Sequence, residues 1–121
     1  MTFRRFEDLR VFQLSERLSD ELWEIVGSWG YFEKDTVGKQ LVRSADSIGA
    51  NIAEGSGRGT PNDNKRFVRI ARGSLNETKF WLRRASTRNL VDNNQFEFLK
   101  SILDELGPTL NAYLNSIGRN S

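Results

Sequence analysis

The sequence contains no histidine and no cysteine among its 121 residues. Without cysteine, the chain can form no disulfide, thiolate nucleophile or cysteine metal site. Without histidine, it lacks the usual general acid or base near neutral pH, the serine and cysteine triads, and most zinc and iron sites. A di-iron centre of the kind found in helical bundles is also excluded, because it needs paired Glu-x-x-His motifs. We therefore expect no enzymatic activity, metal, cofactor or small-molecule substrate.

Long apolar runs are missing as well. No segment approaches the roughly 20 apolar residues that span a membrane, and the basic residues Arg4 and Arg5 are followed within three positions by Glu7 and Asp8. We therefore expect no signal peptide and no membrane contact, and we expect the protein in the cytoplasm. Apolar residues make up 37% of the chain and charged residues 28%, which is typical of one globular domain covering residues 1–121.

Apolar residues recur at steps of three and four in four segments, and this spacing predicts four helices. We expect them at about residues 8–28, 34–54, 61–88 and 92–117. Thr60 and Pro61 suit the cap and first turn of the third helix, whereas Gly107-Pro108 should kink or split the fourth. Long helices joined by short connections pack as antiparallel neighbours, so we expect an all-α, up-down-up-down four-helix bundle. The expected inward face of the third helix consists of Phe67, Ile70, Ala71, Ser74, Thr78, Trp81 and Ala85.

Three segments carry a recognisable pattern. Residues 40–55 read QLVRSADSIGANIAEG and contain the core Ser-Ile-x-x-Asn-Ile-Ala-Glu-Gly, while residues 6–11 read FEDLRV and residues 67–77 read FVRIARGSLNE. Together they resemble the bacterial four-helix-bundle family encoded in intervening sequences of 23S ribosomal RNA genes, also called S23 proteins. The chain departs from that pattern at Gly49, where the family commonly has proline, and at Val42-Arg43, where many members have paired arginines.

The resemblance implies a four-helix bundle without enzymatic activity that assembles with copies of itself into a ring, often a homo-pentamer. A related bundle is an accessory protein of diversity-generating retroelements, where it assists a reverse transcriptase and contacts nucleic acid. RNA, DNA or a reverse transcriptase are therefore further partners that the resemblance implies.

A polar signature accompanies the resemblance and consists of Asn51, Glu54, Gly55, Ser74 and Glu77. We expect Asn51 and Ser74 to form buried hydrogen bonds that fix the helix register, and Glu54 to pair with Arg58 or Arg43. We expect Gly55 to end the second helix in a left-handed conformation. The alternative is a functional pocket at Asn51, Glu54 and Ser74, and for the loop of residues 55–59 a phosphate cradle.

Basic residues concentrate in the third helix. Residues 62–88 hold eight basic side chains and two acidic ones, whereas the rest of the chain is net acidic. At 100° per residue, five of the basic side chains fall within about 80° of one another, opposite the expected apolar face. This basic ridge consists of Lys65, Arg69, Arg72, Lys79 and Arg83.

The basic ridge has three interpretations. It is a solvated face, or it meets the acidic first helix of a neighbouring subunit, or it binds the phosphate backbone of RNA or DNA. The acidic side chains of the first helix are Glu16, Asp20, Glu21 and Glu24. We take backbone binding by a homo-oligomer as the leading hypothesis, and a protein-binding scaffold that docks an acidic partner or subunit as the alternative.

Two further groups have less specific interpretations. Trp29, Tyr31 and Phe32 either cover the end of the bundle or contact another subunit. A carboxylate enzyme built around Glu54 and Glu77 has no histidine or metal-ligand set to support it.

Overall fold

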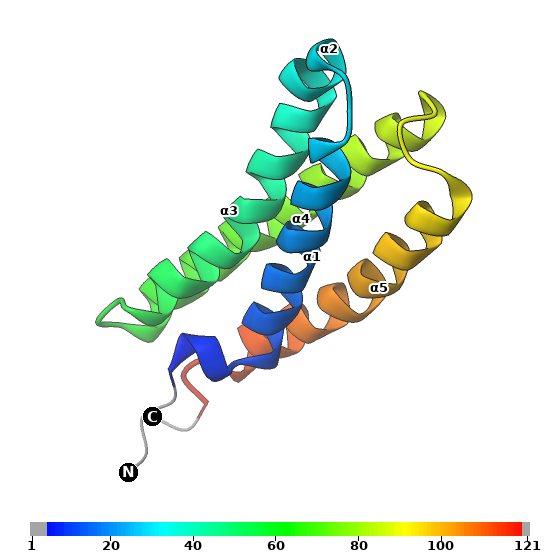
Figure 1. The fold of residues 1–121 in the computed structure, drawn as a ribbon. Helices are drawn as coiled ribbons and strands as arrows, with labels where there is room; N and C mark the ends of the chain where they lie inside the picture. Colours follow the sequence, from blue (N-terminus) through cyan, green and yellow to red (C-terminus); the bar gives the residue numbers. More distant parts are fainter. Residues whose placement is uncertain (1–4, 120–121) are drawn as a thin grey trace.

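The computed structural model describes residues 5–119, which form helices and their connections. The four long helices are α1 (Arg10–Gly27), α3 (Lys39–Ser56), α4 (Pro61–Thr87) and α5 (Asn93–Ser116). Three short elements precede α1 and α3, namely the 3₁₀ turn η1 (Phe6–Asp8), the helical turn α2 (Tyr31–Glu33) and the π-helical turn η2 (Lys34–Gly38). Successive long helices run in opposite directions (Figure 1), which confirms the expected all-α four-helix bundle.

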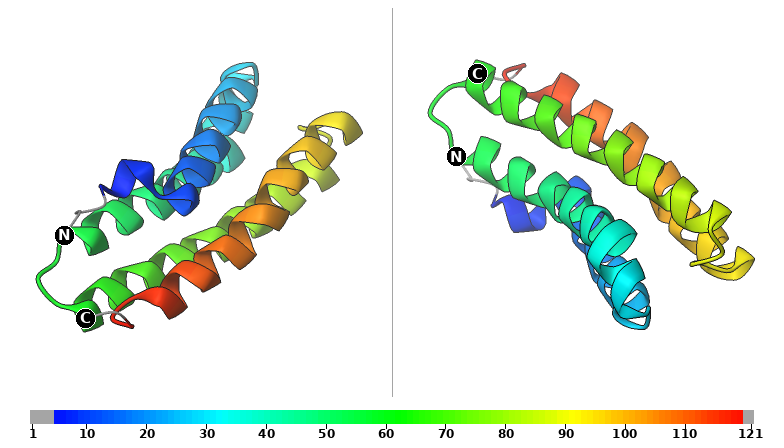
Figure 2. Two further views of the ribbon diagram at one scale, coloured as in Figure 1. Left: turned by 90° about the horizontal axis from the view of Figure 1, so that it is seen from below. Right: turned by 90° about the horizontal axis from the view of Figure 1, so that it is seen from above.

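The bundle has two layers (Figure 2). Helices α1 and α3 form one layer and α4 and α5 form the other, and the two layers diverge toward the end that carries α2 and the α4–α5 turn. Helix α3 packs against α4, and α1 packs against α5, so the four helices enclose one common core. Within residues 5–119, no helix combines the length and the apolar character that crossing a membrane requires.

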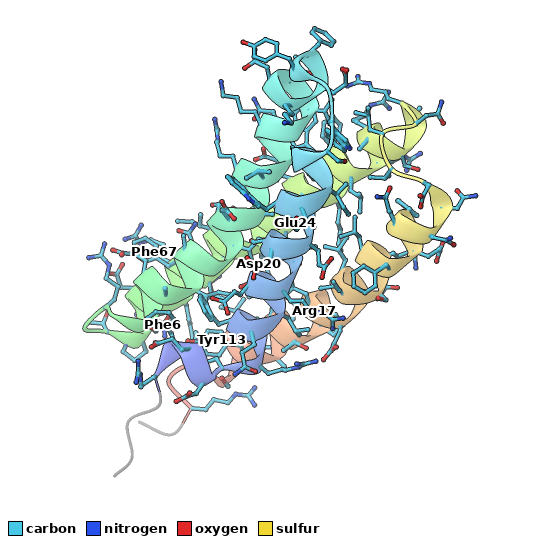
Figure 3. All side chains as sticks on the ribbon, viewed as in Figure 1. Phe6, Arg17, Asp20, Glu24, Phe67 and Tyr113 are labelled. Carbon is cyan, nitrogen blue, oxygen red and sulfur yellow. The ribbon has the colours of Figure 1, made fainter. Side chains whose placement is uncertain are left out.

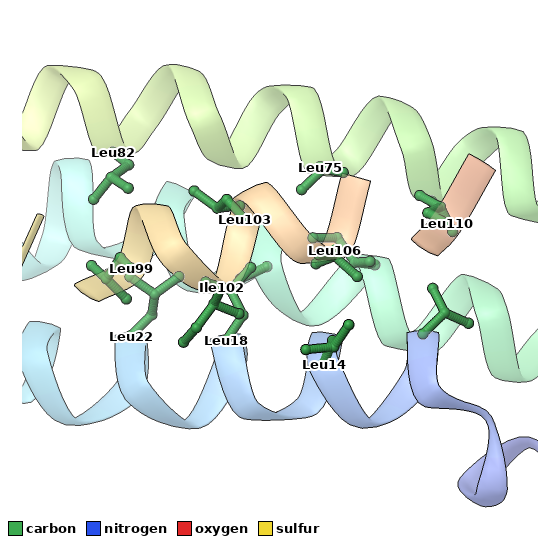
Figure 4. Close-up of a cluster of buried hydrophobic side chains, with 14 of the residues drawn as sticks. Leu14, Leu18, Leu22, Leu75, Leu82, Leu99, Ile102, Leu103, Leu106 and Leu110 are labelled. Atoms are coloured by element: carbon green, nitrogen blue, oxygen red, sulfur yellow. The ribbon is translucent and has the colours of Figure 1, made fainter. Parts of the chain in front are cut away.

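The core consists of aliphatic side chains contributed by every long helix. Figure 4 shows leucines of α1, α4 and α5 pointing toward one another in this core. The apolar stripe of α3 lies in the core, because Val37 of η2 and Leu41, Ala45, Ile48 and Ile52 of α3 are all buried. Burying a side chain of this kind stabilises the folded state by about 1.5–3 kcal/mol, so these stripes hold the bundle together.

The inward face of α4 differs from the predicted one. Its buried residues are Val68, Ala71, Leu75, Thr78, Leu82 and Ala85. Four residues predicted to point inward lie outside this face, since Ile70 is 43% exposed and Phe67, Ser74 and Trp81 are half-buried. The prediction failed because α4 carries two apolar stripes side by side. The stripe with the seven-residue repeat of Val68, Leu75 and Leu82 faces the core, as in other antiparallel bundles.

The ends of α4 follow local sequence signals. The hydroxyl oxygen of Thr60 accepts a hydrogen bond from the backbone N–H of Asp63 at 3.2 Å, and Pro61 occupies the first turn, as predicted. At the other end, Asn89 adopts a left-handed backbone conformation with φ of 59°. The backbone N–H of Leu90 then donates to the carbonyl of Ala85 at 2.9 Å and closes the helix end.

The last helix was predicted to kink or split at Pro108. It does not split, because α5 continues through Pro108 to Ser116, whereas the kink stays a prediction. Pro108 is exposed, so the lost backbone N–H is on the solvent side. The neighbouring core residues Leu106 and Leu110 are buried and hold both halves of the helix against the bundle.

Candidate nucleic-acid interface

The basic ridge lies on the flank of α4 that faces α5. The guanidinium of Arg72 donates a hydrogen bond to the side-chain oxygen of Asn111 on α5 at 3.4 Å. Lys79 and Arg83 line a shallow cavity of about 410 Å³ together with residues of α5. The ridge is therefore beside the buried face of α4 and not opposite to it, which corrects the prediction and follows from the altered orientation of the helix.

The charges of the ridge are not neutralised within the described chain. Arg69, Arg72, Lys79 and Arg83 are exposed and Lys65 is half-buried. Among residues 5–119, none of these five side chains forms an ion pair. The ridge can therefore offer its full charge to an anionic partner.

Lys100 and Asp104 of α5 line the same cavity as Lys79 and Arg83, and they add an ion pair without net charge beside the ridge. The ammonium of Lys100 donates a hydrogen bond to Asp104 at 2.9 Å. This hydrogen bond raises the pKa of Lys100 above its ordinary value, and the attraction between the two charges adds to the effect. The sequence pattern missed Lys100 because helical periodicity within α4 says nothing about which residues of α5 lie next to it.

The outer face of α4 lies beside the ridge and carries both apolar and polar side chains. It carries Ile70 at 43% exposed, Phe80 at 53% exposed and the half-buried Trp81. Phe80 and Trp81 pack edge to face with ring centroids 4.9 Å apart. Glu77 lies on the same face and accepts a hydrogen bond from the indole N–H of Trp81 at 3.2 Å. The face combines apolar area with a small number of polar groups, as subunit contacts do.

Asn51 and Ser74 belong to a hydrogen-bonded seam between α3 and α4. The Asn51 amide donates to the carbonyl of Ser47 at 2.8 Å, and the hydroxyls of Ser47 and Ser74 lie 2.9 Å apart. A second pair is fully buried, since the hydroxyls of Thr78 and Ser44 lie 2.9 Å apart. Because a register shift would break these pairs, the seam fixes how α3 sits on α4. Asn51 and Ser74 thus form hydrogen bonds as expected, but these bonds are partly buried and not fully buried.

Gly55 has a role different from the predicted one. It lies inside α3, which ends at Ser56, and its backbone is not left-handed. A Cβ at this position would lie 2.6 Å from the side-chain oxygen of Asn64, and 3.0 Å from both the backbone oxygen of Asn64 and the Cβ of Phe67. The predicted helix stop is therefore wrong, and Gly55 instead permits the close approach of α3 and α4.

Glu54 pairs with Arg58, one of the two arginines expected, at 3.6 Å. Arg58 also contacts Asp63 at 3.3 Å and lies over the ring of Phe67, 4.7 Å from its centroid. Both partners of the Glu54 pair are exposed, so the pair itself contributes at most about 1 kcal/mol. Glu54 and Glu77 thus have separate partners, one in the α3–α4 connection and one on the outer face of α4.

The aromatic residues between α1 and α3 divide into two groups. Trp29 is partly buried and packs against the core. Tyr31 and Phe32 are 83% and 73% exposed, so they do not cover the end of the bundle. Their exposure leaves subunit or partner contact as the remaining interpretation of these two residues.

Helix α1 carries unpaired acidic side chains. Glu16, Asp20 and Glu24 recur at every fourth residue and are exposed, and Figure 3 shows Asp20 and Glu24 along this helix. Within residues 5–119, neither these three nor the half-buried Glu21 forms an ion pair. The molecule therefore has an acidic row on α1 and a basic ridge on α4.

Comparison with known proteins gives one family and one fold. The family model described as "23S rRNA-intervening sequence protein" matches residues 7–112. A crystal structure of a protein of unknown function from the S23 ribosomal protein family of Bacteroides thetaiotaomicron is 23% identical, with a TM-score of 0.77. The match covers 88% of this chain and 99% of that one, and it shows a shared fold. No curated protein matches.

The matched region contains all four long helices almost completely, and it includes the polar seam, Gly55 and the basic ridge. The chain belongs to the family of 23S rRNA-intervening sequence proteins.

Proposed function

We propose that the protein is a non-enzymatic, cytoplasmic accessory protein that binds the phosphate backbone of RNA or DNA through the basic ridge of α4. The observation that carries the proposal is the uncompensated charge of the basic ridge, because none of its five cations forms an ion pair within residues 5–119 and four of them are exposed. Such cations can bind phosphates and release the counterions of a nucleic acid without first breaking ion pairs within the protein.

The dimensions of the ridge suit a duplex. Lys65 and Arg83 are 18 residues apart on one continuous helix, which corresponds to about 27 Å at 1.5 Å per residue. A duplex presents a phosphate every 3.4 Å along each strand, so the ridge can reach several phosphates of one strand. Phosphate contacts position a protein without reading sequence, and we therefore expect recognition of shape and charge only.

Self-association is part of the proposal. The resemblance to ring-forming bundles supports it, and so do the exposed Ile70 and Phe80 on the outer face of α4. Single exposed apolar residues are ordinary on protein surfaces, but the adjoining rings of Phe80 and Trp81 form an apolar patch that favours contact with another chain. A ring would repeat the ridge once per subunit and would raise the avidity for a long nucleic acid without any new contact. A reverse transcriptase as an additional partner rests on the resemblance alone.

The test is charge reversal on and off the ridge. A triple variant Arg69→Glu, Arg72→Glu and Arg83→Glu should lose binding to a labelled duplex, measured by fluorescence anisotropy at low salt. The matched control reverses three arginines off the ridge, Arg17, Arg88 and Arg119, and lowers the net charge by the same amount. Far-UV circular dichroism verifies that both variants remain helical. Equal loss of affinity in the two variants would show that net charge and not the ridge governs binding.

A second candidate function has its own observation. The unpaired acidic row of Glu16, Asp20 and Glu24 on α1 is complementary to the ridge, so the ridge of one subunit can dock on α1 of the next. In that case the protein is a protein-binding scaffold, and the triple reversal on the ridge should dissociate the assembly. Failure of the wild-type protein to bind any nucleic acid at low salt, combined with this dissociation, would favour the scaffold.

A further inference from the structure

A groove between α1 and α3 lies apart from the basic ridge and contains an exposed tryptophan. The groove has a volume of about 520 Å³ and is formed by α1, η2 and α3. Its apolar surface comes from Val26 and Val42, and Trp23 stands at its edge with 65% of its surface exposed. The exposed indole of Trp23 presents a large apolar surface, which an aromatic ring stacked on it would cover.

The π-helical turn η2 places cations along this groove. Within the turn, the backbone N–H of Lys39 donates to the carbonyl of Lys34, five residues earlier. In a regular α-helix, residues five apart point about 140° away from each other, whereas the wider turn brings Lys34 and Lys39 to the same groove. Arg43 follows Lys39 by one α-helical turn and lines the groove as well. π-helical turns of this kind occur frequently at functional sites.

The charge along the groove is positive. Lys34, Lys39 and Arg43 are opposed by one acidic lining residue, Asp46. Lys34 and Arg43 form no ion pair within residues 5–119, and the contact of Lys39 with Asp35 is 3.9 Å long and exposed. Exposed pairs of that kind are weak, so all three cations are accessible to an anion.

We propose that this groove binds single-stranded RNA or DNA, with one base stacked on Trp23 and the following phosphates on Lys34, Lys39 and Arg43. The row of cations spans nine residues, or about 13 Å at 1.5 Å per residue, so each of the three cations can meet a separate phosphate at a spacing of 3.4 Å or more per nucleotide. A stacking indole beside a positive groove is the arrangement that binds single strands. A duplex does not fit this role, because its bases are already stacked on one another. The inference rests on the proposed nucleic-acid function and adds a second, structurally separate site to it.

The experiment compares a labelled 12-nucleotide oligothymidylate with a labelled 16-base-pair duplex by fluorescence anisotropy. Trp23→Ala should weaken binding of the single strand by about 5- to 150-fold, the range expected for loss of one base–aromatic stack. Binding of the duplex to the ridge should change less than about twofold. Phe98→Ala is the matched control, because Phe98 is also an exposed aromatic beside a cation, with Arg17 at 5.4 Å from its ring centroid, but on α5.

A conservative variant adds a second measurement. Trp23→Phe keeps a ring for stacking and should retain most of the affinity, yet it should abolish the quenching of tryptophan fluorescence by the single strand. The double variant Lys34→Gln, Arg43→Gln should bind the single strand more weakly, and its affinity should depend less on the salt concentration. Because Trp23 is exposed, these variants should unfold at the temperature of the wild-type protein.

Unchanged affinity of Trp23→Ala for the single strand, with duplex binding intact, would overturn this inference and leave the proposed function standing. The inference would also be overturned if the protein bound polyglutamate but not oligothymidylate and lost this binding in Trp23→Ala. The groove would then be assigned to an acidic protein partner. Absence of binding to both nucleic acids would refute both proposals.

Discussion

Two glycines on neighbouring helices should respond to the same substitution in opposite directions. Gly55 and Gly73 both lie within helices, in α3 and α4 respectively. A Cβ at Gly73 would meet no atom within 4 Å, whereas a Cβ at Gly55 would lie 2.6 Å from the side-chain oxygen of Asn64. Comparing the two substitutions therefore separates two effects on stability, namely the higher helix propensity of alanine and the steric cost of a Cβ between α3 and α4.

The expected magnitudes follow from these surroundings. Gly73→Ala should stabilise the protein by up to about 1 kcal/mol, the difference in helix propensity between glycine and alanine. At Gly55 the side chain of Asn64 can move aside, but the backbone oxygen of Asn64 and the Cβ of Phe67, both at 3.0 Å, can yield only if α4 shifts. Overpacking of this kind costs about 1–3 kcal/mol, and the small propensity gain in the last turn of α3 offsets only part of it. We expect a net loss of about 1–2 kcal/mol for Gly55→Ala.

The assay is thermal unfolding followed by far-UV circular dichroism, at one low protein concentration because assembly would shift the midpoint. One kcal/mol corresponds to about 3–5 °C for a domain of this size. Gly73→Ala should raise Tm by up to that amount, and Gly55→Ala should lower it by about 3–10 °C. A Gly55→Ala variant as stable as Gly73→Ala would refute the close approach of the two helices at this point.

The remaining predictions concern the polar seam and the assembly. Thr78→Val and Ser44→Ala should each lower the free energy of unfolding in urea by about 1 kcal/mol. The double variant should lose less than the sum of the two, because the two hydroxyls are hydrogen-bonded to each other. Strictly additive losses would mean that they do not interact. Light scattering should find an oligomer at micromolar concentration that Ile70→Glu with Phe80→Glu dissociates, because both side chains lie on the exposed outer face of α4. A wild-type protein that is monomeric under these conditions would eliminate the self-association in the proposed function.

Much of the fold could be predicted because the apolar spacing and the capping residues of a single helix can be read from the sequence. The stripe from Leu41 to Ile52 has one apolar face, so its orientation toward the core follows directly from helical spacing. The start of α4 could be predicted for a similar reason, since the cap at Thr60 depends only on residues within one turn.

Other features depend on contacts between helices, which spacing within one helix does not contain. Helix α4 has two apolar stripes, and the packing of α3 and α5 decides that Leu75 and Leu82 face inward while Ile70 faces outward. The role of Gly55 depends on the position of Asn64 in the next helix.

The candidate sites divide in the same way. The five cations of the ridge could be found from sequence because they share one helix, but their position beside α5 and the nearby Lys100 could not. The row of Lys34, Lys39 and Arg43 could not be predicted from the helical spacing of 3.6 residues per turn. The π-helical turn makes the spacing between Lys34 and Lys39 wider than in an α-helix.

The salt dependence of duplex binding tests the central claim most directly. With about four phosphates neutralised by the ridge of one subunit, the logarithm of the binding constant should fall with the logarithm of the salt concentration at a slope near −3.6. Affinity should then drop about 150-fold between 50 and 200 mM salt. The variant with Arg69, Arg72 and Arg83 changed to glutamate should show no measurable binding, and the off-ridge triple variant should keep the wild-type slope. A wild-type slope near zero, or the same slope in the ridge variant, would contradict the assignment of the ridge as the nucleic-acid interface.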